Sequence, residues 1–299
     1  MSAVGRVQTR TPVLVSVVMP ARDSAATIDE QLGALAAQDY DGPWEVVVAD
    51  NGSRDATVAV ARAWTGRLPG LQVVDASARP GASFARNAGV AATTGDFLAF
   101  CDADDIVTPG WLSALVAAGC EYDMVGGPLD LVTLNDDDSR AWIGWDCPDD
   151  RLAPCQGFLL TVYGGTCGAW RTALEQVGGW NDEYRTHNDR ELSWRVQTAA
   201  LRLGFAPGAV AHYRMRQSLR VLVRKSYNDG RAMVRIYADY RDAGAPRSDT
   251  RRALRAWVGF VVHAPELTRS RVRRGVYLRR LAEHAGRVAG SVHHRVLYL

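Results

Sequence analysis

The sequence predicts an α/β fold in which helices flank a largely parallel, doubly wound sheet. Apolar, β-branched runs recur along the N-terminal third, as expected for parallel strands that are buried on both faces; they lie at 13–19, 44–49, 71–74 and 97–101. Segments with helical spacing of apolar residues alternate with them, at 25–38, 55–64 and 81–92. Polar clusters follow the first, second and fourth runs, at 20–23, 50–55 and 102–105. Because ligands of open α/β sheets bind beyond the carboxyl ends of the strands, these clusters are expected to line one crevice.

The pattern becomes mixed beyond Pro109. We expect an edge strand at 124–127, a strand at 164–170 that continues into a short helix, a helix at 189–200 and a strand at 209–213. A long helix is predicted at 218–240, followed by a basic helical segment over 249–299 that is interrupted near Pro265. This pattern divides the chain into a domain of residues 1–215 and a basic, amphipathic helical extension of residues 216–299.

The composition is that of a globular protein. The chain has 299 residues, of which 47% are hydrophobic and 23% charged, so it can bury a large core. Its five cysteines are odd in number and lack C-x-x-C spacing, which disfavours structural zinc and a disulfide framework and indicates reduced thiols. No signal-peptide pattern opens the chain, and no window approaches the roughly 18 apolar residues of a membrane span. We therefore expect a cytoplasmic protein.

The net charge of +2 conceals an asymmetry. Residues 214–299 hold 20 Lys and Arg against 6 Asp and Glu, whereas the rest of the chain holds 15 against 27. Apolar residues around Trp257 and Phe260 stand between clusters of arginine, a pattern typical of a helix in a membrane interface. An anionic surface on the inner face of the plasma membrane is the expected partner, rather than nucleic acid. The alternative is that this segment packs on the first domain or on a second subunit, which leaves a homodimer open.

The first candidate site is Asp102-Ala103-Asp104-Asp105, directly after a predicted buried strand. Carboxylates this close repel one another unless a cation neutralises them. Oxygen ligands suit Mn²⁺ or Mg²⁺, which often share their coordination with substrate phosphates. Asp50 is the second candidate, since a carboxylate at a strand end can accept hydrogen bonds from a base or ribose. The alternatives are an acidic turn at 102–105 and a turn at Asp50.

These segments resemble the donor-binding half of family-2 inverting glycosyltransferases of the GT-A fold. The likeness lies in residues 15–23, 46–55, 81–87 and 95–105, and the pattern extends over about 14–215. The resemblance implies a Rossmann-like mixed sheet and a nucleotide-sugar donor, with UDP-sugar favoured over GDP- or dTDP-sugar. It implies donor contacts from six residues: Pro20, Ala21, Arg22, Asp50, Arg86 and Asp102. At Arg22 the family often has an aromatic residue or Asn instead. The resemblance also implies that Asp104 binds the metal. For Arg86 the alternative is a surface helix residue whose stem is packed down.

The second half of the pattern implies an acceptor site. His187-Asn188-Asp189-Arg190-Glu191 resembles the family's Glu-Asp motif, with Asn188 in the Glu position. By this resemblance Asp189 is the catalytic base, with Glu191 as the second choice. The alternative is that Asn188 and Asp189 only cap a helix. His212, at the end of a predicted strand, matches a histidine that reaches the metal in family members. The other histidines after it are predicted to be surface residues: His263, His284, His293 and His294.

The expected function is therefore transfer of a sugar from a nucleotide-diphosphate sugar to a hydroxyl acceptor, a lipid-linked or cell-envelope glycan. Two alternatives remain. A sugar-phosphate nucleotidyltransferase should carry a Gly- and Lys-rich loop after its first strand, where this chain has Pro20 to Ser24. A non-catalytic nucleotide- or glycan-binding scaffold is favoured only by Asn188.

Overall fold

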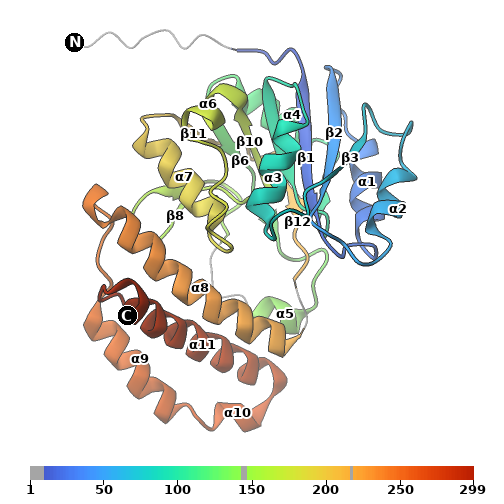
Figure 1. Ribbon diagram of the computed structural model, residues 1–299. Helices are drawn as coiled ribbons and strands as arrows, with labels where there is room; N and C mark the ends of the chain where they lie inside the picture. Colours follow the sequence, from blue (N-terminus) through green and yellow to red (C-terminus); the bar gives the residue numbers. More distant parts are fainter. Residues whose placement is uncertain (1–9, 143–146, 216–217) are drawn as a thin grey trace, which may run out of the picture. The chain divides into compact units, whose positions relative to one another are not determined.

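The structure is a computed structural model that describes residues 10–142, 147–215 and 218–299. It confirms the predicted fold class, because a central mixed sheet is flanked by helices (Figure 1). The chain forms two compact units. We call the first the sheet unit; it comprises 1–130, 147–153 and 160–213. The second, the helical unit, comprises 131–146, 154–159 and 214–299, so it takes in two short segments that precede the predicted C-terminal extension.

The parallel half of the sheet follows the predicted strand and helix order. Strand β1 (Val15–Ala21) lies between β2 (Trp44–Asp50) and β4 (Phe97–Cys101), and β3 (Gln72–Asp75) extends the sheet beyond β2, all in parallel. Helices α1 (Ile28–Ala36), α2 (Thr57–Arg62) and α3 (Ala82–Ala91) connect these strands. The carboxyl ends of β1, β2 and β4 therefore meet at one edge of the sheet.

The other half of the sheet corrects one sequence prediction. Strand β10 (Thr166–Trp170) runs antiparallel between β4 and β6 (Met124–Gly126), so the sheet is mixed, as the resemblance implied. The predicted edge strand at 124–127 is wrong in its position: β6 is interior, and β11 (Leu203–Phe205) forms the edge. A strand of only three residues has too little periodicity to be recognised from sequence, and the order of strands depends on tertiary pairing.

The remaining elements of the sheet unit surround this frame. Helix α4 (Trp111–Gly119) follows β5 (Ile106–Val107), α6 (Arg171–Gln176) follows β10, and α7 (Asn188–Thr198) precedes β11. A small second sheet joins β5, β12 (Ala211–His212) and β7 (Leu129–Asp130), and two two-residue strands pair as β8 (Ala153–Pro154) and β9 (Leu160–Thr161).

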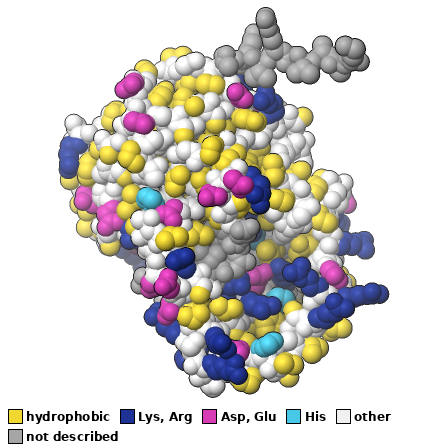
Figure 2. All heavy atoms as spheres, turned by 180° about the vertical axis from the view of Figure 1, so that it is seen from behind, with side chains coloured by type: hydrophobic (Ala, Val, Ile, Leu, Met, Phe, Trp, Pro, Cys, Tyr) yellow, Lys and Arg dark blue, Asp and Glu magenta, His cyan; other side chains and the backbone are white. Residues whose placement is uncertain are grey.

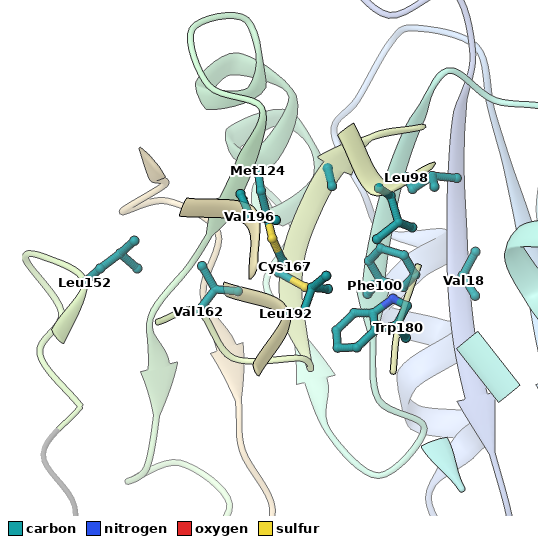
Figure 3. Close-up of a cluster of buried hydrophobic side chains, with 12 residues drawn as sticks. Val18, Leu98, Phe100, Met124, Leu152, Val162, Cys167, Trp180, Leu192 and Val196 are labelled. Carbon is teal, nitrogen blue, oxygen red and sulfur yellow. The ribbon is translucent and has the colours of Figure 1, made fainter. Parts of the chain in front are cut away.

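A hydrophobic cluster holds α7 against the sheet (Figure 3). Phe100 of β4 and Trp180 pack edge to face with ring centroids 5.2 Å apart, and Leu192 of α7 is fully buried in the same cluster. Such an aromatic pair contributes about 0.5–1.5 kcal/mol beyond its burial. Buried Cys167 belongs to this core, and none of the five cysteines, all of which lie among the described residues, forms a disulfide. The core thus fixes the start of α7 relative to the strand ends.

The helical unit is built on two long neighbouring helices that run parallel, α8 (Leu219–Tyr240) and α11 (Arg271–His294), which lie side by side in Figure 1. Glycines allow their backbones to approach closely: a Cβ on Gly230 of α8 would overlap the Glu283 carbonyl, and one on Gly286 of α11 would overlap that of Tyr227. The shorter elements are α5 (Asp137–Ala141), the 3₁₀ turn η1 (Arg241–Ala243), α9 (Thr250–Val262) and α10 (Glu266–Arg269). Among the helices described, none is long and apolar enough to cross a bilayer.

Candidate active site

Hydrogen bonds join the loop after β1 to the loop after β2. The Asp23 N–H donates to Ser53 Oγ at 3.0 Å, and the Arg54 N–H donates back to Asp23 Oδ1 at 2.8 Å. Asp23 has a φ of 50°, a left-handed conformation that Asp adopts more readily than most residues. Asp55 also binds the first loop, since its Oδ2 accepts the Ala25 N–H at 3.0 Å. The hydroxyl of Thr57 is the main cause that lowers the pKa of Asp55.

The predicted donor-contact residues sit on these two loops. Pro20 and Ala21 end β1, where Ala21 pairs with Asp50, and Arg22 is exposed. Asp50 is half-buried, and its carboxylate accepts the Ser53 N–H at 3.3 and 3.2 Å. The turn expected as an alternative for Asp50 is therefore formed. A turn bond of this kind leaves further lone pairs of the carboxylate for a ligand.

Helix α1 joins the third loop to the same edge. The Gln31 side chain is fully buried; its Nε2 donates to the Asp102 carbonyl at 3.0 Å, and its Oε1 accepts the Val107 N–H at 3.0 Å. The Thr27 hydroxyl donates to the Ala103 carbonyl, also at 3.0 Å. The three polar clusters predicted to converge are thus linked by hydrogen bonds, because the carboxyl ends of neighbouring parallel strands meet at one edge.

Three carboxylates form an acidic cluster in this loop. Asp102, Asp104 and Asp105 each offer one oxygen within 4.8 Å of the others; Asp105 is buried, and the other two are half-buried. Like charges this close destabilise one another unless they are protonated or neutralised. An all-oxygen donor set fits a hard divalent cation such as Mg²⁺ or Mn²⁺. The acidic residues therefore fit the predicted metal.

Arg86 of α3 is the positive partner of this cluster. Its Nη2 donates to Asp102 Oδ1 at 2.6 Å and to the Gly164 carbonyl at 3.2 Å, and its guanidinium lies 4.5 Å from the centroid of Trp180. The residue is only 3% exposed. The alternative of a surface helix residue for Arg86 is therefore wrong, because α3 turns this side chain toward the strand ends.

Asp189 lies in the first turn of α7, beside the same glycine. Its Oδ2 accepts the Gly164 N–H at 3.3 Å, and its Oδ1 accepts the Arg190 N–H at 2.8 Å. Asn188, which replaces the Glu of the motif, donates from Nδ2 to Ser83 Oγ at 2.9 Å and so connects α7 to α3. The Gly164 peptide consequently contacts both Arg86, through its carbonyl, and Asp189, through its N–H.

Glu191 faces a different environment. It is 4% exposed, and its two carboxylate oxygens accept from Arg195 at 2.9 and 2.8 Å. Arg195 also donates to the carbonyls of Val177 and Gly179. Glu191 thus serves as one half of an i, i+4 ion pair, a spacing that the sequence already contained.

His212 lies on β12, opposite Ile106 of β5 and beside Asp130 of β7. Its Nδ1 is 2.6 Å from Asp130 Oδ2. A carboxylate on one ring nitrogen fixes the tautomer and orientation of a histidine and is the usual support for a metal ligand that binds through the other. Within the described residues, the cluster of neighbouring metal-ligating atoms comprises the three aspartates alone.

Sequence reasoning missed two features of this site. A Cβ on Gly165 would stand 3.0 Å from Asp102 Oδ2 and 3.1 Å from Asp105 Oδ2, and a Cβ on Gly164 would stand 3.0 Å from Arg86 Nη2. The Gly-Gly pair was the available signal, since it marks close approach of the backbone to other groups. Asp130 was the other omission, and no local pattern distinguishes it from an ordinary strand-end carboxylate.

Comparison with known proteins agrees with this geometry. Residues 16–199 match the profile of glycosyl transferase family 2. The glycosyltransferase AglE of Haloferax volcanii is 25% identical over 311 residues, which cover 94% of this chain and 97% of that protein. The pre-mycofactocin glycosyltransferase of Mycobacterium tuberculosis is 27% identical over 257 residues, which cover 82% of this chain; the chain spans about half of that relative, 52% of its length.

Solved structures share the fold. A mannosyltransferase from Pyrobaculum calidifontis, determined with GDP-Man and Mn²⁺, aligns with a TM-score of 0.60 and 21% identity over 95% of this chain and 76% of that one. Residues 1–349 of TarS from S. aureus, with UDP-GlcNAc, align with a TM-score of 0.55 and 16% identity over 95% of this chain and 93% of that one. Because the family match spans more than half of the chain and the neighbours share its sheet, this protein belongs to glycosyl transferase family 2 and has a GT-A fold.

Proposed function

We propose that the protein is a metal-dependent, inverting glycosyltransferase that moves a sugar from a nucleotide-diphosphate sugar to a hydroxyl group. The observation that carries this proposal is the arrangement around Gly164, whose peptide contacts Arg86 and Asp189 within one site. Arg86 in turn binds Asp102 of the acidic cluster. The Gly164 peptide therefore connects the proposed cation site of the donor, through Arg86, with the Asp189 carboxylate that is proposed to act on the acceptor.

The donor is held by the three loops at the strand ends. Pro20, Ala21 and Arg22 contact the nucleotide, Asp50 the base, and Asp102 the ribose, while Arg86 lies near the diphosphate. Asp104 and His212 would hold Mn²⁺ or Mg²⁺. When bound, this cation supplies positive charge that stabilises the departing diphosphate.

Asp189 is the general base of the reaction. The acceptor hydroxyl transfers its proton to the Asp189 carboxylate as the hydroxyl oxygen forms a bond to the anomeric carbon. The bond from that carbon to the diphosphate breaks on the opposite side, so the configuration inverts. Hydrogen bonds from the N–H groups of Gly164 and Arg190 orient the carboxylate. General-base assistance of this kind contributes about 10²–10⁴-fold to the rate.

The donor class is supported by the neighbours, which were determined with GDP-Man and Mn²⁺ or with UDP-GlcNAc. A UDP-sugar is the preferred donor, with GDP- and dTDP-sugars as alternatives. A thermal-shift panel of these three donor classes with Mn²⁺ or EDTA, on wild type and Asp104→Ala, tests the proposal. A ligand at 100 times its Kd stabilises the folded state by about 2.7 kcal/mol, an upward shift of a few degrees in Tm.

We expect one nucleotide to raise Tm only with metal, and Asp104→Ala to abolish the effect. Stabilisation by a nucleotide that is unaffected by EDTA and by Asp104→Ala would refute the metal-dependent donor site. Metal-dependent binding without sugar transfer or donor hydrolysis would instead favour the non-catalytic scaffold. The specific observation for that alternative is Asn188, which stands where the motif has a carboxylate and donates a hydrogen bond to Ser83.

The acceptor in this proposal is a lipid-linked or cell-envelope glycan at the inner face of the plasma membrane. Its support is an apolar stripe on α9, where Leu254, Val258, Val261 and Val262 are 60–78% exposed. Their spacing places them on one face of the helix, next to exposed Arg251 and Arg255. Flotation with vesicles of phosphatidylglycerol and phosphatidylcholine tests this part: Val258→Ser/Val261→Ser should reduce binding, and equal flotation of variant and wild type would refute it.

A further inference from the structure

The helical unit contains a cavity of about 1010 Å³ that is partly open to solvent. Its walls come from α9, α11, His263, Glu266 of α10, the segment 247–249, the C-terminal residues and two residues of the segment 154–159, all within the helical unit. A volume of this size is at the upper end for small-molecule sites. The proposed donor site lies in the sheet unit and uses none of these residues, so the cavity is a separate feature.

The side chains that line the cavity carry an excess of positive charge. Seven of them are arginines, against three acidic residues, Asp249, Glu266 and Glu283. The arginines are Arg247, Arg252, Arg255, Arg273, Arg279, Arg280 and Arg287. Figure 2 shows Lys and Arg side chains gathered over the helical unit, with His side chains among them. A cavity with this balance attracts an anion.

Only part of this charge is neutralised internally. Glu283 accepts from Arg279 at 3.3 Å and from Arg287 at 2.7 Å, and Glu266 pairs with Arg273 at 3.2 Å. In the chain as described, the other four guanidinium groups have no carboxylate within 4.0 Å; they belong to Arg247, Arg252, Arg255 and Arg280. Several guanidinium groups around one hollow provide planar, bidentate donors that match phosphate oxygens.

Two further donors in the wall are unsatisfied. The Nε atoms of Arg279 and Arg287 are buried, and neither has a hydrogen-bond partner among the described residues. Burial is the main cause that lowers the pKa of Arg279, with the charge of Arg280 acting in the same direction. Buried donors without acceptors are rare in folded proteins, and these two add to the positive character of the wall.

One side of the cavity is apolar and aromatic. Phe260 packs edge to face with Tyr277 at 5.7 Å and with His284 at 5.2 Å between ring centroids. Ala256, Val272 and Val276 continue this surface. His284 is half-buried here, so its prediction as a surface residue is wrong. The cavity thus combines guanidinium groups with an apolar wall, as a ligand with a charged head and an apolar body requires.

We propose that this cavity binds a phosphate or diphosphate group carried by a small apolar or amphiphilic molecule. Four guanidinium groups without carboxylate partners favour a multiply charged anion over a single carboxylate. The apolar wall distinguishes the ligand from a bare ion. The source is either the head of a lipid phosphate or a soluble phosphate ester. The inference does not depend on the proposed transfer reaction, because none of its residues belongs to the donor site.

Calorimetry on the full-length protein tests the site with two probes: pyrophosphate, and dihexanoyl phosphatidic acid below its micelle concentration. Dihexanoyl phosphatidylcholine, which has no net charge, is the lipid control. The cavity variant is Arg252→Gln/Arg255→Gln/Arg280→Gln; all three side chains are exposed, so the fold should survive. A matched variant, Arg220→Gln/Arg224→Gln/Arg274→Gln, removes the same charge from exposed positions of the same unit that do not line the cavity.

We expect at least one probe to bind wild type, the cavity variant to lose at least tenfold in affinity, and the matched variant to stay within twofold. Tighter binding of phosphatidic acid than of pyrophosphate identifies a lipid phosphate, and the reverse identifies a soluble ester. Equal losses in the two variants, equal binding of phosphatidylcholine, or no binding of either anion would overturn the proposal. Nucleotide stabilisation with Mn²⁺, measured on the same variants, reports separately on the donor site and should be unchanged.

Discussion

Arg86 and Asp102 form an ion pair whose two partners are shielded unequally from water. The Nη2 atom of Arg86 lies 2.6 Å from Asp102 Oδ1, and the side chains are 4% and 31% exposed. Asp102 also faces the carboxylates of Asp104 and Asp105. Arg86 is therefore the internal cation of a crowded acidic loop, in the position where a bound divalent ion would add further positive charge.

Replacement of this cation should make the fold depend on metal. Without Arg86 the three carboxylates repel one another, and we expect Arg86→Met to lower the free energy of unfolding in EDTA by about 1–3 kcal/mol. Saturating Mn²⁺ should restore more stability to the variant than it adds to wild type. Urea unfolding with and without Mn²⁺ measures both effects. Arg62→Met, at an exposed position of α2, is the control; a similar metal response in the control and in Arg86→Met would contradict the prediction.

Substitution of Asp189 should affect mainly catalysis, whereas substitution of Glu191 should affect mainly stability. Asp189→Asn keeps the size of the side chain and one acceptor oxygen but removes the basic carboxylate and one of the two acceptors for the N–H groups of Gly164 and Arg190, so kcat should fall by about 10²–10⁴-fold with only a modest loss in Tm. Glu191→Gln should instead lower stability with little change in kcat. It weakens a buried bidentate pair with Arg195, which costs about 1.5–3 kcal/mol. Donor turnover and thermal unfolding of both variants provide the comparison. If Glu191→Gln lost more activity than Asp189→Asn, the assignment of the base would have to be reversed.

A side chain at position 165 should weaken the binding of metal to the acidic cluster. An added Cβ would stand 3.0 Å from Asp102 Oδ2, so Gly165→Ala must displace that carboxylate by a few tenths of an ångström. Changes around the ligands of a metal typically cost about 10–100-fold in affinity, and we expect a loss in that range for Mn²⁺. Titration of Mn²⁺ followed by electron paramagnetic resonance measures it. Gly259→Ala, where a Cβ meets nothing within 4 Å, should bind Mn²⁺ like wild type.

His284 should make the helical unit sensitive to acid. Burial lowers the pKa of His284 from its usual 6.5, and the positive charges of Arg287 and Arg280 act in the same direction. Glu283 opposes them, and Trp257 and Phe260 face the ring from α9. The unfolded chain therefore binds a proton at His284 more readily than the folded chain does. The stability that neutral His284 contributes is present above pH 6.5 and is lost as pH falls through the lower pKa of the folded state.

His284→Gln should therefore lose less stability than wild type on acidification. Urea midpoints at about pH 7.5, 6.5 and 5.5 test the difference, within the range in which histidine titrates. His263→Gln, at an exposed position beyond the end of α9, should follow wild type. Parallel pH profiles for wild type and His284→Gln would exclude this histidine as the source of acid sensitivity.

The sequence alone determined the alternation of strands and helices and the convergence of three polar loops. Both follow from local information: apolar runs identify buried strands, and the carboxyl ends of neighbouring parallel strands must meet at one edge. The acidic loop at 102–105 could be found in this way, because its carboxylates are adjacent in the chain.

Tertiary structure decided what lies against that loop. The partner of Asp102 is Arg86, the partner of His212 is Asp130, and Gly164 reaches Asp189 only because β10 enters the sheet antiparallel beside β4. The cavity of the helical unit likewise brings together residues that are distant in the chain, from Gln156 to Leu299. Sequence spacing cannot reveal these relationships, since contacts between distant segments are fixed by strand order and helix packing, which depend on the burial of the whole core rather than on any one motif.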